Sequence, residues 1–194
     1  MFIALLDTSV LWPSLQRDFL LSLAIERVYR PVWSETILAE LEYHEALKLQ
    51  KRGAETTDAE ARAVRLVSQM RTVFSDAMAT GWEPLEGSYG LPDPDDEHVV
   101  AAAQIAGAGV IVTANLKDFP KKLLPDGIDA VPVTEFTRDA VSLSPTRSLA
   151  AITQIASRSG RTGPQLTELD IIDILESRYG MVEAMAIVRA ELPT

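Results

Sequence analysis

The sequence of 194 residues contains no cysteine. This absence excludes disulfides, zinc–thiolate sites and cysteine nucleophiles, and it is typical of a reducing compartment. Long apolar runs are also lacking, because the longest, residues 99–112, contains Gln104 and two glycines and is too short to span a bilayer. The apolar N-terminus has no basic leader and is interrupted by Asp7, which is unlike a signal peptide. We therefore expect a soluble, cytoplasmic protein without membrane association.

Positive charge is scarce. Lys and Arg together number 18 against 28 Asp and Glu, and the net charge is −10. Taken globally, this charge argues against a protein that binds nucleic acid through phosphate contacts alone. The charge is unevenly distributed, however, because residues 83–97 hold six acidic and no basic side chains, whereas residues 140–161 hold three arginines and no acidic side chain. A local basic surface is therefore compatible with the composition.

Hydrophobic residues make up 47% of the chain, which is enough for a core of ordinary size. Short apolar runs typical of buried strands alternate with segments of helical spacing. The predicted strands are residues 2–6, 28–33, 110–113 and 130–133, and the predicted helices include 34–52, 58–80 and about 96–106. This alternation predicts an α/β fold around a mostly parallel sheet.

The pattern changes after about residue 140, where strand signals stop. Two or three helices are predicted in this C-terminal part, with a break at residues 159–164. Thr167 and Asp170 have the spacing of a capping box, in which each side chain bonds to the backbone of the other residue. We therefore predict a first domain at residues 1–138 and a helical extension at residues 139–194.

Acidic residues fall where sites form in parallel sheets, at the carboxyl ends of strands or at the starts of helices. They come from distant parts of the chain: Asp7, Glu40, Asp96 and Asp118. If they converge, two carboxylates about 4 Å apart repel by roughly 4 kcal/mol at an effective dielectric near 20, so a counter-charge is needed. An all-oxygen ligand set suits Mg²⁺ or Mn²⁺, which would activate water for hydrolysis of a phosphodiester.

Small polar side chains accompany these acids. The hydroxyls of Thr8, Ser9 and Thr113 and the amide of Asn115 could orient water or ligands around a metal ion.

Four blocks carry a resemblance to a known family. Taken in order, LLDTSVLW, SETILAEL, LPDPDDEHVVAAA and VIVTANLKDFP resemble the signature blocks of the PIN domain, over about residues 1–136. The resemblance implies a three-layer α/β/α domain and a metal-dependent ribonuclease. The forms DPDDEHVVAAA and TANLKDFP are most similar to VapC-type toxins of toxin–antitoxin pairs, in the subgroup with a helical C-terminal extension.

The resemblance also assigns roles to residues. It makes Asp7, Asp96 and Asp118 metal ligands and Glu40 the glutamate of the second block, with Asp93 a second acid beside Asp96 and Asn115 a supporting residue. The helical pattern does not separate Glu40 from Glu42, since the apolar face flanks both about equally; the block match favours Glu40.

The resemblance further implies an RNA substrate, a small antitoxin that docks on the protein, and a homodimer. Six basic residues are candidates for contact with the RNA backbone: Lys117, Lys121, Lys122, Arg147, Arg158 and Arg161. Two alternatives stay open, namely a catalytically silent binding module of the same fold, and a phosphatase or DNA nuclease that uses the same acids.

Several residues also have purely structural interpretations. Capping and solvation would explain Asp95 and Glu97. His98 is expected on a helix surface, although it could touch a carboxylate or the substrate. Packing in a core or an interface is the expectation for Trp12, Trp33 and Trp82.

Overall fold

The structure is a computed structural model that describes residues 1–161 and 163–193. These residues divide into two compact units, which we describe separately. The sheet unit comprises Phe2–Trp12 and Pro31–Ala130, and the helical unit comprises Met1, Pro13–Arg30 and the described residues from Val131 onward. The domain division after residue 138 stays a prediction.

Four strands form one sheet: β1 (Ile3–Leu6), β2 (Arg30–Val32), β3 (Val110–Val112) and β4 (Asp129–Val131), in the order β2-β1-β3-β4. The central pair, β1 and β3, runs parallel, with Leu5 opposite Ile111. Both of these side chains are fully buried, as expected of strands in a sheet covered on both faces. The predicted α/β fold with a mostly parallel sheet is confirmed.

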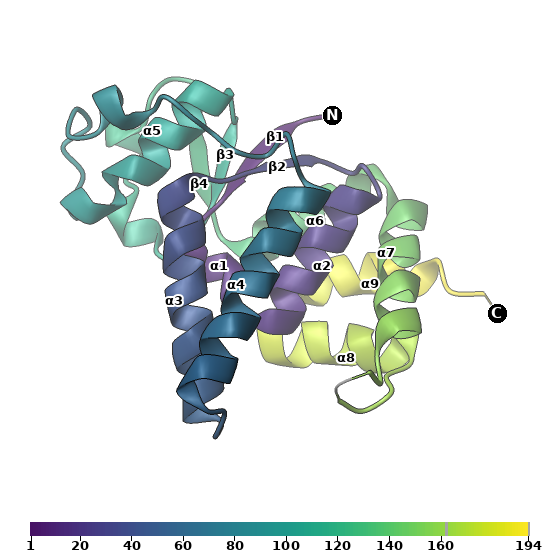
Figure 1. Cartoon of the computed structure of the whole chain (residues 1–194). Coiled ribbons are helices and arrows are strands. Elements are labelled where there is room, and N and C mark those ends of the chain that lie inside the picture. The colour runs from purple at the N-terminus through teal and green to yellow at the C-terminus, as the bar shows by residue number, and fades with distance from the viewer. Residues whose placement is uncertain (162, 194) are drawn as a thin grey trace. The chain divides into compact units, whose positions relative to one another are not determined.

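The sheet unit also contains helices (Figure 1). They are α1 (Thr8–Leu11), α3 (Glu35–Lys51), α4 (Thr56–Val73) and α5 (Glu97–Ala106), with short 3₁₀ turns η1 (Glu83–Leu85), η2 (Pro94–Asp96), η3 (Leu116–Asp118) and η4 (Lys121–Leu123). The long helices α3 and α4 lie side by side as a hairpin. Ser34 caps α3, because its side chain accepts a hydrogen bond from the Ile37 N–H at 3.2 Å.

The predicted end of α4 at Thr80 is wrong, because the helix stops at Val73. Beyond it the chain pairs with the segment after β2 in a parallel bridge between Trp33 and Met78. The Trp33 N–H donates to the Ala77 carbonyl at 3.0 Å, and its own carbonyl accepts from the Ala79 N–H at 2.8 Å. This pairing satisfies backbone groups that a continued helix would have bonded internally, so tertiary structure overrides the local helical spacing.

Helix α5 ends at a glycine. Gly107 has a φ of 65°, in the left-handed region that favours glycine, and its N–H bonds back to carbonyls of the last helical turn. The segment 107–109 is therefore the turn that leads into β3.

The helical unit contains α2 (Ser14–Ile25), α6 (Val133–Leu143), α7 (Pro145–Arg158), α8 (Glu168–Tyr179) and α9 (Val182–Ala190). Its core includes an edge-to-face pair of Tyr29 and Phe136 with ring centroids 4.9 Å apart. The sequence predicts the helices after residue 140, but its strand at 130–133 is too long, since α6 begins at Val133. Pro132 has no N–H for a strand ladder and sits just before the first helical turn, so the chain changes structure there.

The predicted capping box at the start of α8 is confirmed. The Thr167 Oγ1 accepts from the Asp170 N–H at 3.2 Å, and the Asp170 carboxylate accepts from the Thr167 N–H at 2.8 Å. The predicted break at 159–164 falls between α7 and α8, and residue 162 within it lies outside the described residues. Within residues 1–161 and 163–193, no helix combines the length and apolar character needed to cross a bilayer.

Candidate active site

Asp7 lies at the carboxyl end of β1 and is only 7% exposed. Its N–H still donates to the Val112 carbonyl of β3 at 3.1 Å, so the ends of the two central strands meet at this residue. The Oδ2 of Asp7 accepts hydrogen bonds from Ser9 Oγ at 2.6 Å and Thr113 Oγ1 at 2.7 Å. These two hydroxyls, predicted as supporting residues, fix the rotation of the carboxylate.

Glu40 reaches the same region from α3. The Thr8 Oγ1 donates to Glu40 Oε2 at 2.5 Å, and His98 Nε2 lies 3.4 Å from Oε1. Burial opposes ionisation of this carboxyl, but hydrogen bonds from His98 and Thr8 outweigh burial and lower the pKa of Glu40. Glu40 is therefore ionised at neutral pH and is held between two partners.

Asp7, Glu40 and Asp96 line one open cavity of about 510 Å³. Its other lining residues are Thr8, Ser9, Trp12, His44, Ala114 and Asn115. The sheet topology thus brings together acids separated by up to 89 positions in the chain, from residue 7 to residue 96. Convergence of these three acids, which spacing alone left unproven, is present in the structure.

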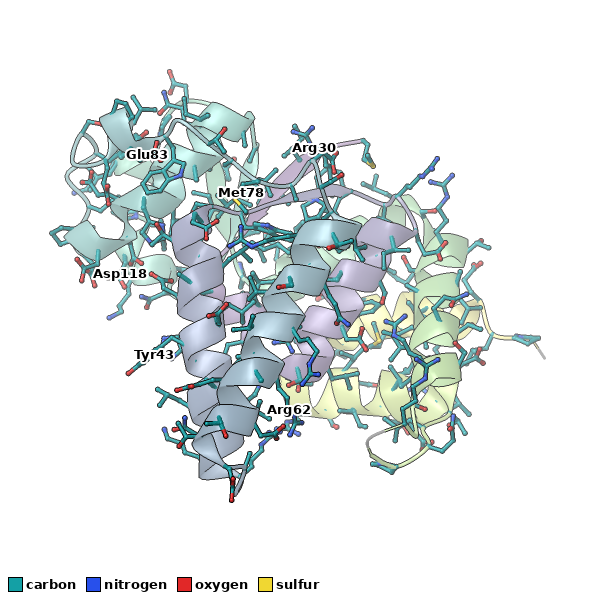
Figure 2. The ribbon with its side chains drawn as sticks, viewed as in Figure 1. Arg30, Tyr43, Arg62, Met78, Glu83 and Asp118 are labelled. Carbon is teal, nitrogen blue, oxygen red and sulfur yellow. The ribbon has the colours of Figure 1, made fainter. Side chains whose placement is uncertain are left out.

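Glu42 takes a different direction from Glu40. It lines a separate groove between α3 and α4, together with Glu35, Tyr43 and Arg71. The Tyr43 side chain projects away from α3 (Figure 2). Of the two glutamates that the helical pattern left open, Glu40 faces the other acids.

Asp96 opens α5 and is half-buried. Burial is the largest cause that raises its pKa, to about 6, and the negative charges of Asp7, Asp93 and Asp118 add to it, while His98 acts in the opposite direction. Its Oδ2 is fully buried and accepts no hydrogen bond from the part of the chain that the structure describes. Asp96 thus presents a buried oxygen to the region where three other carboxylates concentrate negative charge.

The neighbours of Asp96 differ from their predicted roles. Asp93 caps the 3₁₀ turn η2, because its Oδ1 accepts from the Asp95 N–H at 3.0 Å, whereas the Asp96 side chain makes no capping hydrogen bond at the start of α5. Glu97 is not a surface residue: it is 3% exposed, and its carboxylate accepts from the N–H groups of Tyr89 and Leu91 at 3.2 and 3.1 Å. Burial would raise the pKa of Glu97, but these backbone hydrogen bonds lower it. Glu97 therefore anchors the loop that precedes the acidic stretch.

The segment after β3 carries Asn115 and Asp118. The Asn115 N–H donates to Thr113 Oγ1 at 3.0 Å, so the chain turns tightly around the hydroxyl that also binds Asp7. Asp118 is 8% exposed, and Lys117 Nζ lies 3.8 Å from its Oδ2. Asp118 is outside the lining of the cavity, and its charge acts on Asp96 through space.

The six basic residues predicted to contact RNA have different surroundings. Lys117 and Lys122 are exposed in the sheet unit, whereas Lys121 pairs with Asp129 and donates to the Ile128 carbonyl at 3.1 Å. The three arginines belong to the helical unit. There Arg158 pairs with Asp18 at 2.5 Å, Arg147 donates to the Arg27 carbonyl at 3.4 Å, and Arg161 is exposed.

The acidic side chains offer the oxygen ligands that divalent cations prefer, but they are too far apart to share one ion. Within residues 1–161 and 163–193, no three His, Asp or Glu side chains are close enough to hold one ion as they stand. The buried, unpartnered Oδ2 of Asp96 and the carboxylates that raise its pKa are nevertheless the oxygen donors that Mg²⁺ and Mn²⁺ prefer. A bound cation would have to draw these side chains together against their mutual repulsion.

The expected surface position of His98 is wrong, whereas the alternative that it touches a carboxylate is confirmed by its approach to Glu40 Oε1 at 3.4 Å. His98 is 4% exposed, not on the helix surface, and its ring lies near Trp82 with centroids 5.9 Å apart. A signal was present, since the run Val99–Ala103 is apolar on every side, and a helix with that pattern is buried all round. Residues in its first turn then share buried surroundings with the site.

Comparison with known proteins agrees with the fold. Residues 4–117, more than half of the chain, match the PIN domain, and the protein therefore belongs to the PIN-domain family. PIN domains are generally nucleases and typically use divalent metal ions, so the match suggests a nuclease. Searches of curated proteins and of solved structures gave no significant match.

Proposed function

We propose that this protein is a Mg²⁺- or Mn²⁺-dependent endoribonuclease and the toxin of a type II toxin–antitoxin pair. The observation that carries the catalytic part is that Asp96 lines one cavity with Asp7 and Glu40 and keeps a buried Oδ2 without a hydrogen-bond partner among the described residues. Membership of the PIN-domain family supports nuclease chemistry. The block forms DPDDEHVVAAA and TANLKDFP, with helices after them, support the toxin subgroup.

In this proposal Asp7, Asp96 and Asp118 hold the metal ion. A bound Mg²⁺ or Mn²⁺ supplies Lewis-acid polarisation of a phosphoryl oxygen and lowers the pKa of a bound water. The chain orients this set: Ser9 and Thr113 fix the Asp7 carboxylate, while Thr8 and His98 fix Glu40 with its charge retained. Glu40 can then accept a hydrogen bond from a water molecule at the substrate phosphate.

Lys117 and Lys122 are our candidates in the sheet unit for contact with the RNA backbone. Both are exposed, and positive charge beside an acidic metal site suits a polyanionic substrate. Arg147, Arg158 and Arg161 remain candidates in the helical unit. A small antitoxin and a second copy of the chain are the proposed protein partners.

The test is cleavage of single-stranded RNA and of DNA of the same sequence by the purified protein with Mn²⁺, then with excess EDTA. We expect RNA to be cut, DNA to be spared and EDTA to stop the reaction. Asp7→Asn and Asp96→Asn should each reduce the rate by at least about a hundredfold. Asp95→Asn is the matched control, since that exposed neighbour does not line the cavity.

A catalytically silent binding module is the second candidate. The observation that favours it is the spacing of the acids, which are not close enough to share an ion as they stand in the described part of the chain. Equal cleavage by the parent and both Asn variants would support this alternative. A short neighbouring reading frame with a DNA-binding N-terminal segment would separately support the toxin assignment.

A further inference from the structure

We propose that Trp12 is a stacking platform for an unpaired nucleobase, so that a single-stranded nucleic acid is seated across the acidic cavity. This inference names a recognition residue for the nuclease substrate, and it rests on the function proposed above.

Trp12 differs from the other tryptophans in its exposure. Trp33 is fully buried and Trp82 is 6% exposed, whereas Trp12 is 45% exposed. Of the expected packing in a core or an interface, core burial is found for Trp33 and Trp82 but not for Trp12. The third leaves almost half of a large aromatic surface in contact with water, beside Asp7, Glu40 and Asp96 in the lining of the same cavity.

The indole ring is held in place by residues of α3. Its Nε1–H donates to the His44 carbonyl at 3.4 Å. Lys48 Nζ lies 5.7 Å from the ring centroid and also donates to the Trp12 carbonyl at 3.0 Å. A ring that is already fixed loses little conformational freedom when a base stacks on it, which favours binding.

A second ring lies beside Trp12 in the same cavity. His44 is exposed and lines the cavity, whereas Tyr43, whose ring meets that of His44 edge to face with centroids 5.4 Å apart, lines the separate groove with Glu42. We call Trp12 and His44 the aromatic rim. Exposed rings beside a candidate phosphodiester site match the way single strands are held, with bases on rings and the backbone nearby.

Because the protein is acidic, stacking is expected to contribute more to nucleic-acid binding than phosphate contacts do. The chain carries a net charge of −10, and the cavity itself is acidic, so phosphate contacts alone give weak attraction. Stacking does not depend on neutralising phosphates, and stacked bases contribute substantially to binding in known single-strand binders. A duplex keeps its base faces covered, so the rim selects unpaired segments.

Tryptophan fluorescence tests the inference in the intact chain, with EDTA present to prevent cleavage. Because Trp33 and Trp82 are buried, added ligand should quench Trp12. We expect quenching by a short single-stranded RNA. The same strand annealed to its complement, or an abasic ribose–phosphate strand of equal length, should give little. Equal quenching by the abasic strand would overturn the proposal.

Two substitutions test whether binding requires an aromatic ring at position 12. Trp12→Phe should keep binding within about threefold while losing the quenching, and Trp12→Leu should weaken binding about tenfold or more, as measured by fluorescence anisotropy of a labelled strand. Ile105→Ala is the control, since Ile105 is 48% exposed but does not line the cavity. Unchanged affinity in Trp12→Leu would overturn the inference and indicate that the exposed ring serves a protein contact.

Kinetics distinguish failure of this inference from failure of the nuclease proposal. In the presence of Mn²⁺, Trp12→Leu should raise KM for RNA with kcat nearly unchanged. If the parent cuts RNA and Trp12→Leu has the same KM, the stacking role is wrong while the nuclease stands. If the parent cuts nothing, the nuclease proposal fails independently of the binding data.

Discussion

At the scale of single residues, side-chain carboxylates have three different roles within residues 93–97. Asp93 caps a turn, Glu97 anchors a loop through two backbone amides, and Asp96 lines the cavity with one buried oxygen that has no hydrogen-bond partner among the described residues. The difference lies in what each carboxylate meets. A carboxylate with several N–H partners is stabilised as an anion, whereas one that faces other carboxylates is destabilised.

The unfavourable charge at Asp96 gives a prediction for the metal-free protein. Its folded-state pKa of about 6 exceeds the ordinary value of 3.8, so the folded state holds the proton more tightly. The contribution of Asp96 to the free energy of unfolding therefore falls as pH rises from about 4 to about 6 and stays low above that. We expect Asp96→Asn to be more stable than the parent at about pH 7.5 and close to it at about pH 4.

Urea unfolding with EDTA at both pH values measures this difference. Asp95→Asn, at an exposed position, should change stability little at either pH. A less stable Asp96→Asn at the higher pH would mean that the carboxylates around Asp96 are not close enough to repel it.

Glu97 gives a prediction of opposite sign. Its lowered pKa means that its stabilising effect is present above the ordinary value of 4.5 and is lost as pH falls through the folded-state pKa. Glu97→Ala leaves the buried N–H of Leu91 and the N–H of Tyr89 without their acceptor, and should cost about 2–3 kcal/mol at neutral pH. Thermal unfolding checks it, with exposed Glu83→Ala as the control; equal loss in both variants would contradict this role.

At the scale of elements, sequence was a good guide where local chemistry decides the structure. Ser34 begins α3, Gly107 ends α5, and the capping box begins α8, each by backbone hydrogen bonding within a few residues. The end of α4 was predicted wrongly because the pairing of Trp33 with Met78 depends on residues 45 positions apart in the sequence, 33 and 78. Nothing in the local spacing encodes that contact.

The same distinction applies to the candidate site. The helical pattern could not separate Glu40 from Glu42, because the choice depends on where Thr8 and His98 lie. The burial of His98 could have been predicted from the apolar run that follows it. The exposure of Trp12 could not, because a tryptophan within an apolar segment ordinarily packs in a core or an interface.

The capping box gives a prediction for the helical unit. Thr167→Ala removes the acceptor of the Asp170 N–H and should lower the free energy of unfolding by about 1 kcal/mol. Thr167→Ser keeps the hydroxyl and should stay within a few tenths of the parent. Urea unfolding of the two variants tests it, and equal stability would show that the box contributes nothing.

At the scale of the whole molecule, the acidic composition has a consistent interpretation. A net charge of −10 does not suit a protein that binds nucleic acid by phosphate contacts alone, and the chain nevertheless belongs to a family of nucleases. A bound divalent cation would offset part of the negative charge at the cavity, and the aromatic rim adds attraction that is independent of charge. Together these allow an acidic chain to hold a polyanionic substrate.

Calorimetric titration of the metal-free protein with Mn²⁺ tests most directly whether the converging carboxylates form a metal site. We expect saturable binding to the parent, and binding weakened at least about tenfold in Asp7→Asn and in Asp96→Asn but unchanged in Asp95→Asn. Absence of binding at millimolar Mn²⁺, or equal binding by the parent and both cavity variants, would contradict the proposal that Asp7 and Asp96 hold a catalytic cation.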